Sequence, residues 1–133
     1  MTPEALAELH SACFPDAPIT AEQAARTLQS PANRLYAVKD AFLVAAVALP
    51  EADITHIGVH PRARRQGQAR RLLGALQQDV ETIFLDVSES NIAAIRLYES
   101  MNFKAISRRK HYYAVPGGYE DALLMKWTAA AES

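Results

Sequence analysis

The sequence predicts an α+β fold (mixed α/β) in which helices flank a mixed central sheet. The chain has 133 residues, of which 50% are hydrophobic and 22% are charged, and this balance is typical of a globular protein. The length leaves room for one core, so we expect a single domain over residues 1–133. Helix and strand patterns follow one another in the order α-α-β-β-β-α-β-α-β-β, which implies the mixed sheet.

Two short helices are expected before the first strand. Thr2 and Pro3 are residues that favour the cap and the first turn of a helix. Thr20 and Gln23 match a capping box, which predicts a second helix that ends near Leu28.

Three strands are expected next, over residues 34–39, 42–49 and 54–60, with a turn over residues 50–53. The second strand is nearly all apolar, as expected of a strand that is buried on both faces. Gly58 lies inside the third strand, where a glycine often marks a bulge or a close approach of the backbone.

The second half of the chain alternates between the two kinds of element. One apolar stripe predicts the first of its helices, and an asparagine suited to an N-cap precedes the other. In order, the expected elements are a helix over 67–79, a strand over 82–87, a helix over 91–101 and strands over 103–114 and 122–127.

The composition argues against several classes of protein. Lysine and arginine number 14 and aspartate and glutamate 15, so the net charge is −1 and a general nucleic-acid coat is not expected. Cys13 is the single cysteine, which precludes an internal disulfide, and we expect no metal site. No apolar run reaches the length of a membrane span, and no signal peptide is visible, so we expect a cytoplasmic protein.

The segment from residue 57 to residue 71 suggests an anion site. A strand ends at Pro61, a basic loop follows, and Gly67 begins a helix whose first N–H groups lack partners and carry partial positive charge. Small residues at Gly67 and Ala69 leave room for a phosphate, and five arginines lie between positions 62 and 71. A solvated basic helix start and a pyrophosphate site both fit, whereas a nucleotide P-loop would need a lysine-hydroxyl pair that is absent.

Three blocks of the sequence occur in a recognisable order. They are Val59-x-Pro61 followed by Arg64-x-x-Gly67-x-Ala69, residues 85–103 with Asn91 and Leu97-Tyr98-Glu99, and residues 108–113 with 120–125. The first block resembles the acyl-CoA loop of the GNAT acetyltransferase superfamily, and the second resembles the strand-loop-helix signature of the same superfamily. The third is similar to the ribosomal-protein alanine N-acetyltransferases (RimI type).

The resemblance implies acetyl-CoA as co-substrate and a sheet that splays apart between the strand with Gly58 and the strand with Asp86. The family usually has a strand ahead of the first helix, and we expect this strand to be missing or vestigial here. The implied cofactor-binding residues are Ile57, Gly58, Val59, Arg64, Arg65, Gln66, Gly67, Gln68, Ala69, Arg70 and Asn91.

The resemblance also implies catalytic residues. Tyr98 would be the acid that protonates the leaving thiolate, because a phenol is a donor with a pKa near 10, although its helical spacing also fits a packed core tyrosine. Asp86 would be the base, or would only attract the acceptor amine, since the related enzymes usually carry the longer glutamate at this position. His56 and His60 are alternative bases, but lone histidines in strands are more often structural.

The aromatic pair Tyr112 and Tyr113 would line the peptide site, or would be ordinary strand aromatics. We therefore expect an N-acetyltransferase that modifies a protein N-terminal amine, the alanine of a small-subunit ribosomal protein, by direct transfer in a ternary complex. The alternatives are a small-molecule amine or lysine acetyltransferase and a non-catalytic acyl-CoA-binding module. The expected partner is a protein or peptide N-terminus, without nucleic acid or membrane, and the chain is expected to be a monomer or weak dimer.

Overall fold

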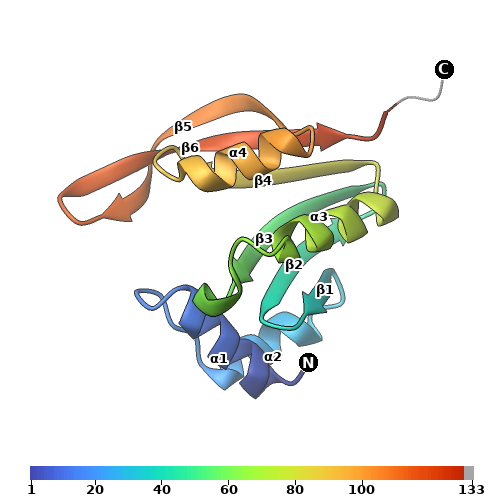
Figure 1. The fold of residues 1–133 in the computed structure, drawn as a ribbon, viewed down its shortest axis with the longest axis vertical. Helices are drawn as coiled ribbons and strands as arrows, with labels where there is room; N and C mark the ends of the chain where they lie inside the picture. Colours follow the sequence, from blue (N-terminus) through green and yellow to red (C-terminus); the bar gives the residue numbers. More distant parts are fainter. Residues whose placement is uncertain (131–133) are drawn as a thin grey trace.

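The computed structural model describes residues 1–130, and its elements follow the expected order (Figure 1). The helices are Pro3–Cys13 (α1), Ala21–Gln29 (α2), Gln68–Asp79 (α3) and Ile92–Ser100 (α4), with a short 3₁₀ turn at Pro61–Ala63. The strands are Asn33–Val38 (β1), Ala41–Ala48 (β2), Glu51–Val59 (β3), Thr82–Ser88 (β4), Lys104–Val115 (β5) and Gly118–Thr128 (β6). None of the helices within residues 1–130 is long and apolar enough to cross a membrane.

The expected helix caps are present. The hydroxyl of Thr2 accepts the N–H of Ala5, and Thr20 and Gln23 form both hydrogen bonds of a capping box. The side chain of Asn91 likewise accepts a hydrogen bond at the start of α4, from Ala94 N at 3.2 Å. These polar side chains set where each helix begins, because they accept hydrogen bonds from N–H groups that have no partner inside the helix.

The six strands form one mixed sheet in the order β1-β2-β3-β4-β6-β5. Only β3 and β4 are parallel, and they pair only where Glu51–Asp53 meets residues 82–84. Beyond these residues the two strands separate, and the sheet opens into two halves (Figure 1). The splay expected between the strands that carry Gly58 and Asp86 is therefore confirmed.

Strand β2 is buried on both faces, as its apolar sequence predicts. Phe42 and Val44 pack in a cluster with residues of α1 and α2, whereas Leu43 and Ala45 pack in a cluster with residues of α3 and α4. Helices α1 and α2 therefore cover one face of the sheet and α3 and α4 the other, because alternate side chains of a strand point to opposite faces.

A β-bulge in β3 changes which of its residues face each layer. Ala45 pairs with Ile54 and Val44 pairs with His56, so Thr55 has no partner in the register. Its hydroxyl donates to the Val44 carbonyl at 3.2 Å. Ile54 packs in the cluster of α3, but after the bulge it is Ile57 that faces this cluster.

Two expected boundaries are wrong. The turn expected over residues 50–53 is shorter, because β3 begins at Glu51 and pairs with both β2 and β4 from that residue onward. Strand β6 begins at Gly118 and not at residue 122, because Gly118 already pairs with Val115 of β5 in the hairpin. In this hairpin many side chains are exposed, so no apolar alternation marks the strand ends in the sequence.

Within residues 1–130 the first element is α1, and no strand precedes it. Strand β1 lies at one edge of the sheet and pairs with β2 only. On the opposite edge, the hairpin of β5 and β6 extends beyond the rest of the molecule (Figure 1).

Candidate functional site

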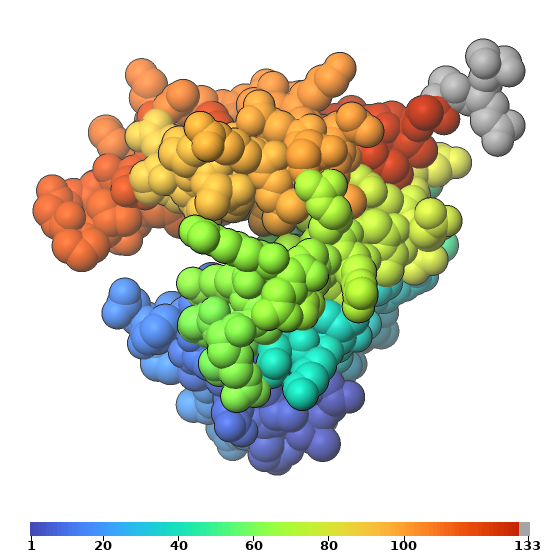
Figure 2. Space-filling view, in the orientation of Figure 1, coloured from blue at the N-terminus to red at the C-terminus, as the bar shows by residue number. Residues whose placement is uncertain are grey.

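The opening between β3 and β4 holds two cavities, one on each side of the sheet. The first, of about 520 Å³, lies between β3 and α4 and includes Gly58, Asn91 and Leu97 in its lining. The second, of about 540 Å³, lies between β3, β4 and α1. Ile57 and Tyr98 line both cavities, so the two spaces meet beside these residues. Figure 2 shows the hollow between residues 60–70 and α4 from outside.

Gly58 allows the end of α1 to lie directly against β3. A Cβ atom at this position would be 2.9 Å from Cε1 of Phe42 and 3.0 Å from Sγ of Cys13. Contacts this short require the neighbours to move, and both are buried in the cluster under α1. Gly58 therefore makes room for the side chains of Phe42 and Cys13, and the bulge of this strand lies at Thr55 instead.

The start of α3 presents free backbone N–H groups. Gly67, the N-cap, has φ 81° and offers no capping side chain, and Arg65 two residues earlier also has a positive φ of 65°. A cavity of about 400 Å³ is lined here by Arg64, Arg65, Gly67, Gln68, Ala69 and Arg70. Uncapped N–H groups beside several arginines form a site that fits a diphosphate.

Two arginines of this site are held in place by hydrogen bonds. Nε of Arg64 donates to the Val59 carbonyl at 3.2 Å, and Nη2 of Arg70 donates to the Ser100 hydroxyl at 2.8 Å. Gln66 is exposed and is not among the residues that line these cavities. Of the proposed loop residues, Gln66 is therefore the one that the structure does not bring to the site.

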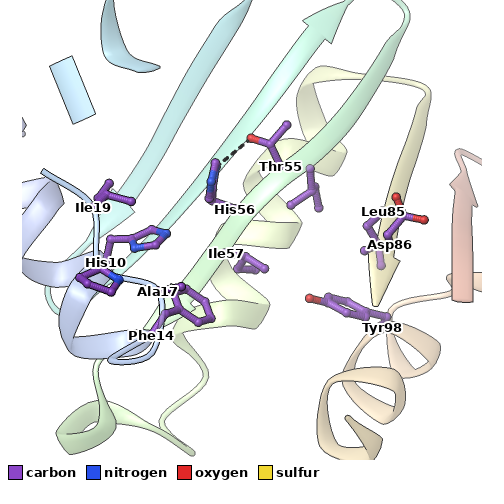
Figure 3. Close-up of a pocket in the computed structure, with 12 residues that line it drawn as sticks. His10, Phe14, Ala17, Ile19, Thr55, His56, Ile57, Leu85, Asp86 and Tyr98 are labelled. Carbon is purple, nitrogen blue, oxygen red and sulfur yellow. Dashed lines mark hydrogen bonds between the residues drawn. The ribbon is translucent and has the colours of Figure 1, made fainter. Parts of the chain in front are cut away.

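Tyr98 projects from α4 into the opening, where Figure 3 shows its hydroxyl pointing toward β3. Tyr98 is 6% exposed, and its ring packs on Phe103, with ring centroids 5.7 Å apart. Burial, with a smaller effect of Tyr113, raises the pKa of Tyr98 to about 12. The phenol is therefore protonated at neutral pH and can donate a hydrogen bond.

Asp86 brings a carboxylate from β4 to the second cavity. Its Oδ1 is buried and has no hydrogen-bond partner among residues 1–130, and the nearest cation is Nε of Arg109 at 3.8 Å. Desolvation, followed by the charge of Asp86, raises the pKa of Asp53 on the neighbouring strand. A carboxylate with this unsatisfied oxygen suits a cationic amine that enters the cavity.

The two tyrosines of β5 differ in exposure. Tyr112 is 48% exposed, and the guanidinium of Arg109 lies 5.3 Å from its ring centroid. Tyr113 is half-buried, and burial followed by the charge of Asp86 raises its pKa. Tyr113 therefore lies close enough to Asp86 to interact with it electrostatically, while Tyr112 lies on the surface.

Sequence reasoning did not place α1 and the following loop at this site. His10, Phe14, Ala17 and Ile19 line the second cavity opposite Asp86 and Tyr98 (Figure 3). No local pattern predicts this, because α1 reaches β3 only through tertiary packing. The sequence signal that could have pointed to it is Gly58, whose missing side chain admits Cys13 at the end of α1.

Residues 4–103 match the Acetyltransferase (GNAT) family. The chain belongs to this family. The sequence-based assignment to GNAT acetyltransferases and the expected α+β fold are both confirmed.

Curated GNAT relatives include ribosomal protein bS18-alanine N-acetyltransferases. The one from Escherichia coli K12 is 42% identical over 90 residues, which are 64% of this chain and 61% of the relative. The one from Haemophilus ducreyi is 37% identical over 91 residues, 64% of this chain and 63% of the relative. The matched regions thus span less than two thirds of these relatives.

Solved GNAT structures match nearly the whole chain. The crystal structure of the ribosomal-protein-S18-alanine N-acetyltransferase from Escherichia coli has a TM-score of 0.84 and 30% identity, covering 98% of this chain and 90% of that one. Arabidopsis thaliana NAA60 in complex with acetyl-CoA covers 96% of this chain and 93% of that one. Its TM-score of 0.80 shows the same fold, at 19% identity.

Among residues 1–130, no group of three or more His, Cys, Asp or Glu side chains could hold a metal ion.

Proposed function

We propose that this chain is an acetyl-CoA-dependent N-acetyltransferase whose acceptor is a protein N-terminal amine, the alanine of a small-subunit ribosomal protein. One observation carries the proposal: the opening in the sheet connects a diphosphate-sized basic site at α3 with a cavity that contains a carboxylate, and Tyr98 lies where they meet. The names of the bS18-alanine N-acetyltransferase relatives support the choice of acceptor.

Acetyl-CoA fits the first cavity by the chemistry of its lining. The N–H groups at the start of α3, with Arg64 and Arg65, would bind the diphosphate. The pantetheine arm would lie along Ile57, Gly58 and Val59, because β4 does not pair with β3 beyond Asp53. When bound, acetyl-CoA supplies an acetyl group activated as a thioester. A backbone N–H near Ile57 would polarise its carbonyl.

The acceptor amine would enter from the second cavity. Asp86 would attract the ammonium and orient it toward the thioester, and Tyr112 and Tyr113 would contact the peptide behind it. Tyr98, protonated and buried, would donate a hydrogen bond to the sulfur as the thiolate leaves. Burial raises the pKa of Cys13, which disfavours a thiolate nucleophile and supports direct transfer in a ternary complex.

The acceptor is tested with a thiol-release assay over a panel of peptides with different first residues. Mass spectrometry then locates the acetyl group. We expect transfer to the α-amine of peptides that begin with alanine, in preference to lysine side chains and small polyamines in the same assay. Preferred transfer to lysine or a polyamine would contradict the proposed acceptor, and acetyl-CoA binding without any transfer would indicate a non-catalytic module.

The role of Tyr98 predicts a selective loss of turnover. Tyr98→Phe should lower kcat by about 100-fold, because the leaving thiolate loses its donor, while the Kd for acetyl-CoA changes by less than about threefold. Tyr119→Phe is the matched control, since Tyr119 is 65% exposed on β6. Stopped-flow thiol release and calorimetry measure the two quantities. An unchanged kcat in Tyr98→Phe would remove the phenol from the reaction.

A further inference from the structure

Two imidazoles lie on the wall of the second cavity that α1 and β3 form. The rings of His10 and His56 have centroids 5.4 Å apart and meet edge to face. Figure 3 shows them across the cavity from Asp86 and Tyr98. Neither histidine is used in the proposed function above.

The fold holds His56 in this position from two sides. The bulge at Thr55 turns His56 toward α1, and Nδ1 of His56 lies 3.2 Å from the Thr55 hydroxyl oxygen. His10 is 6% exposed, its Nδ1 has no hydrogen-bond partner among residues 1–130, and it packs on Phe14 and Phe42. The ring of His56 is thus fixed by its neighbours and still exposes part of its surface to the cavity.

The surroundings of the pair favour a neutral imidazole at physiological pH. Desolvation lowers the pKa of His56, and burial followed by the charge of His56 lowers the pKa of His10. The groups that face the pair from α2 and β2 are uncharged: Ile19 just before α2, Gln23, Thr27 and Val44. The titratable groups across the cavity are Asp86 and Tyr98. Each imidazole disfavours a charge on the other, so the pair takes up one proton before two.

We propose that His56 is the proton acceptor for the acceptor amine, an inference that rests on the proposed N-acetyltransferase function. An N–H bond of the ammonium breaks and its proton moves to a ring nitrogen of His56. The freed lone pair forms the C–N bond at the thioester carbonyl, and the C–S bond breaks as Tyr98 gives its hydroxyl proton to the sulfur. The amide nitrogen then loses its second proton to the Tyr98 oxygen, which restores the phenol and leaves the amide and the free thiol. The proton on His56 then leaves to solvent through the open cavity.

An imidazole suits this step better than the nearby carboxylate. The ring of His56 is neutral in these surroundings and keeps a nitrogen lone pair that can accept the proton inside the cavity. Asp86 is instead engaged in an ion pair with Nε of Arg109, at 3.8 Å. Asp86 is left to attract the ammonium while His56 takes its proton.

The test is the pH dependence of kcat in His56→Gln with an alanine-starting peptide. Near neutral pH we expect a loss of about 100-fold, and kcat should then rise about tenfold per pH unit, because deprotonation now depends on hydroxide. The Kd for acetyl-CoA, measured by calorimetry, should stay at the wild-type value and show that the variant is folded. His60→Asn is the control: it removes an imidazole outside this cavity and keeps a side-chain acceptor for the Arg62 N–H.

The outcomes separate this inference from the proposed function. An unchanged profile in His56→Gln, or a loss that is equal at every pH, would overturn the inference and leave the transferase assignment standing. So would an Asp86→Asn variant that abolishes the acidic limb of the profile, since we expect that variant to raise KM and keep the limb. A wild-type chain that binds acetyl-CoA but transfers to no amine would overturn both.

Discussion

Of the five glycines, Gly58 is the one at which an added Cβ would meet other atoms within 4 Å. Gly58→Ala would place a methyl group against Phe42 and Cys13, at 2.9 and 3.0 Å. We expect it to lower the free energy of unfolding by about 1–3 kcal/mol, measured by urea denaturation. The control is Gly74→Ala in α3, where a Cβ meets nothing within 4 Å and should stabilise the helix by about 0.5–1 kcal/mol.

A double variant locates the strain at Gly58. Adding Cys13→Ala removes Sγ but keeps the Cβ that lies 3.1 Å from the new methyl group. The combined loss should therefore be smaller than the sum of the two single losses. Additive losses would show that the methyl group does not press on Cys13.

At the scale of single residues, the sequence predicted the site residues that lie in a family motif. It missed the site residues that come together only when the helices pack on the sheet. Asp86 and Tyr98 were found through residues 85–103, which resemble the strand-loop-helix signature of the family, and both line the opening. His56 was visible only as a lone histidine in a strand. Its neighbour His10 is 46 positions away in a different element, so their proximity depends on how α1 docks on β3.

At the scale of elements, the left-handed backbone conformation of Gly67 at the start of α3 affects both the stability of the fold and the binding of acetyl-CoA. Gly67→Ala should cost about 1 kcal/mol, because a Cβ at φ 81° is strained even though it meets no atom within 4 Å. We also expect acetyl-CoA to bind about tenfold more weakly, since relaxing this φ turns the N–H groups away from the diphosphate.

Gly117 offers a matched control for Gly67. It lies in the turn between β5 and β6 with φ 89°, and a Cβ there also meets nothing within 4 Å. Gly117→Ala should lose a similar stability in thermal denaturation and keep the affinity for acetyl-CoA in calorimetry. Equal affinities in the two variants would contradict the role given to the N–H groups of α3.

Helices were predicted more accurately than strands because their signals are local. Caps such as Thr20 and Asn91 and the apolar stripe of α3 lie within the elements that they define. The ends of β3 and β6 depend instead on which strand lies alongside. Glu51 belongs to β3 because both β2 and β4 pair with it, and the residues around Glu51 do not indicate this pairing.

At the scale of the whole molecule, the two halves of the sheet are joined by little strand pairing. Parallel pairing of β3 and β4 covers only residues 51–53 and 82–84, and a ligand in the opening would contact both halves. Acetyl-CoA at 100 times its Kd should add about 2.7 kcal/mol of stability, which raises the thermal midpoint by roughly 10 °C. Scanning calorimetry measures the shift.

Hydrogen exchange shows where this stabilisation acts. With acetyl-CoA, slower exchange is expected at residues 57–59 and at the start of α3. 3′-Phosphoadenosine 5′-diphosphate, which keeps the diphosphate and lacks the pantetheine arm, should protect the start of α3 alone. Equal protection of residues 57–59 by both ligands would contradict the placement of the arm along β3.

The family resemblance predicted the splay, but the residues alone leave the strand order β4-β6-β5 open. This order depends on Thr82 meeting Thr128, two residues that are far apart in the chain. Alternating apolar residues show that a strand has a buried face without showing which strand lies beside it.

The unpaired Thr55 decides which side chains of β3 face each of the two layers of helices. Side chains alternate strictly along a regular strand, so His56 and Gly58 would share the orientation of Ala52 and Ile54, beneath α3. The single extra residue inverts this parity, and Ile57 and Val59 take that orientation instead. Deleting Thr55 would restore the regular alternation and turn His56 and Gly58 toward α3, away from the layer of α1.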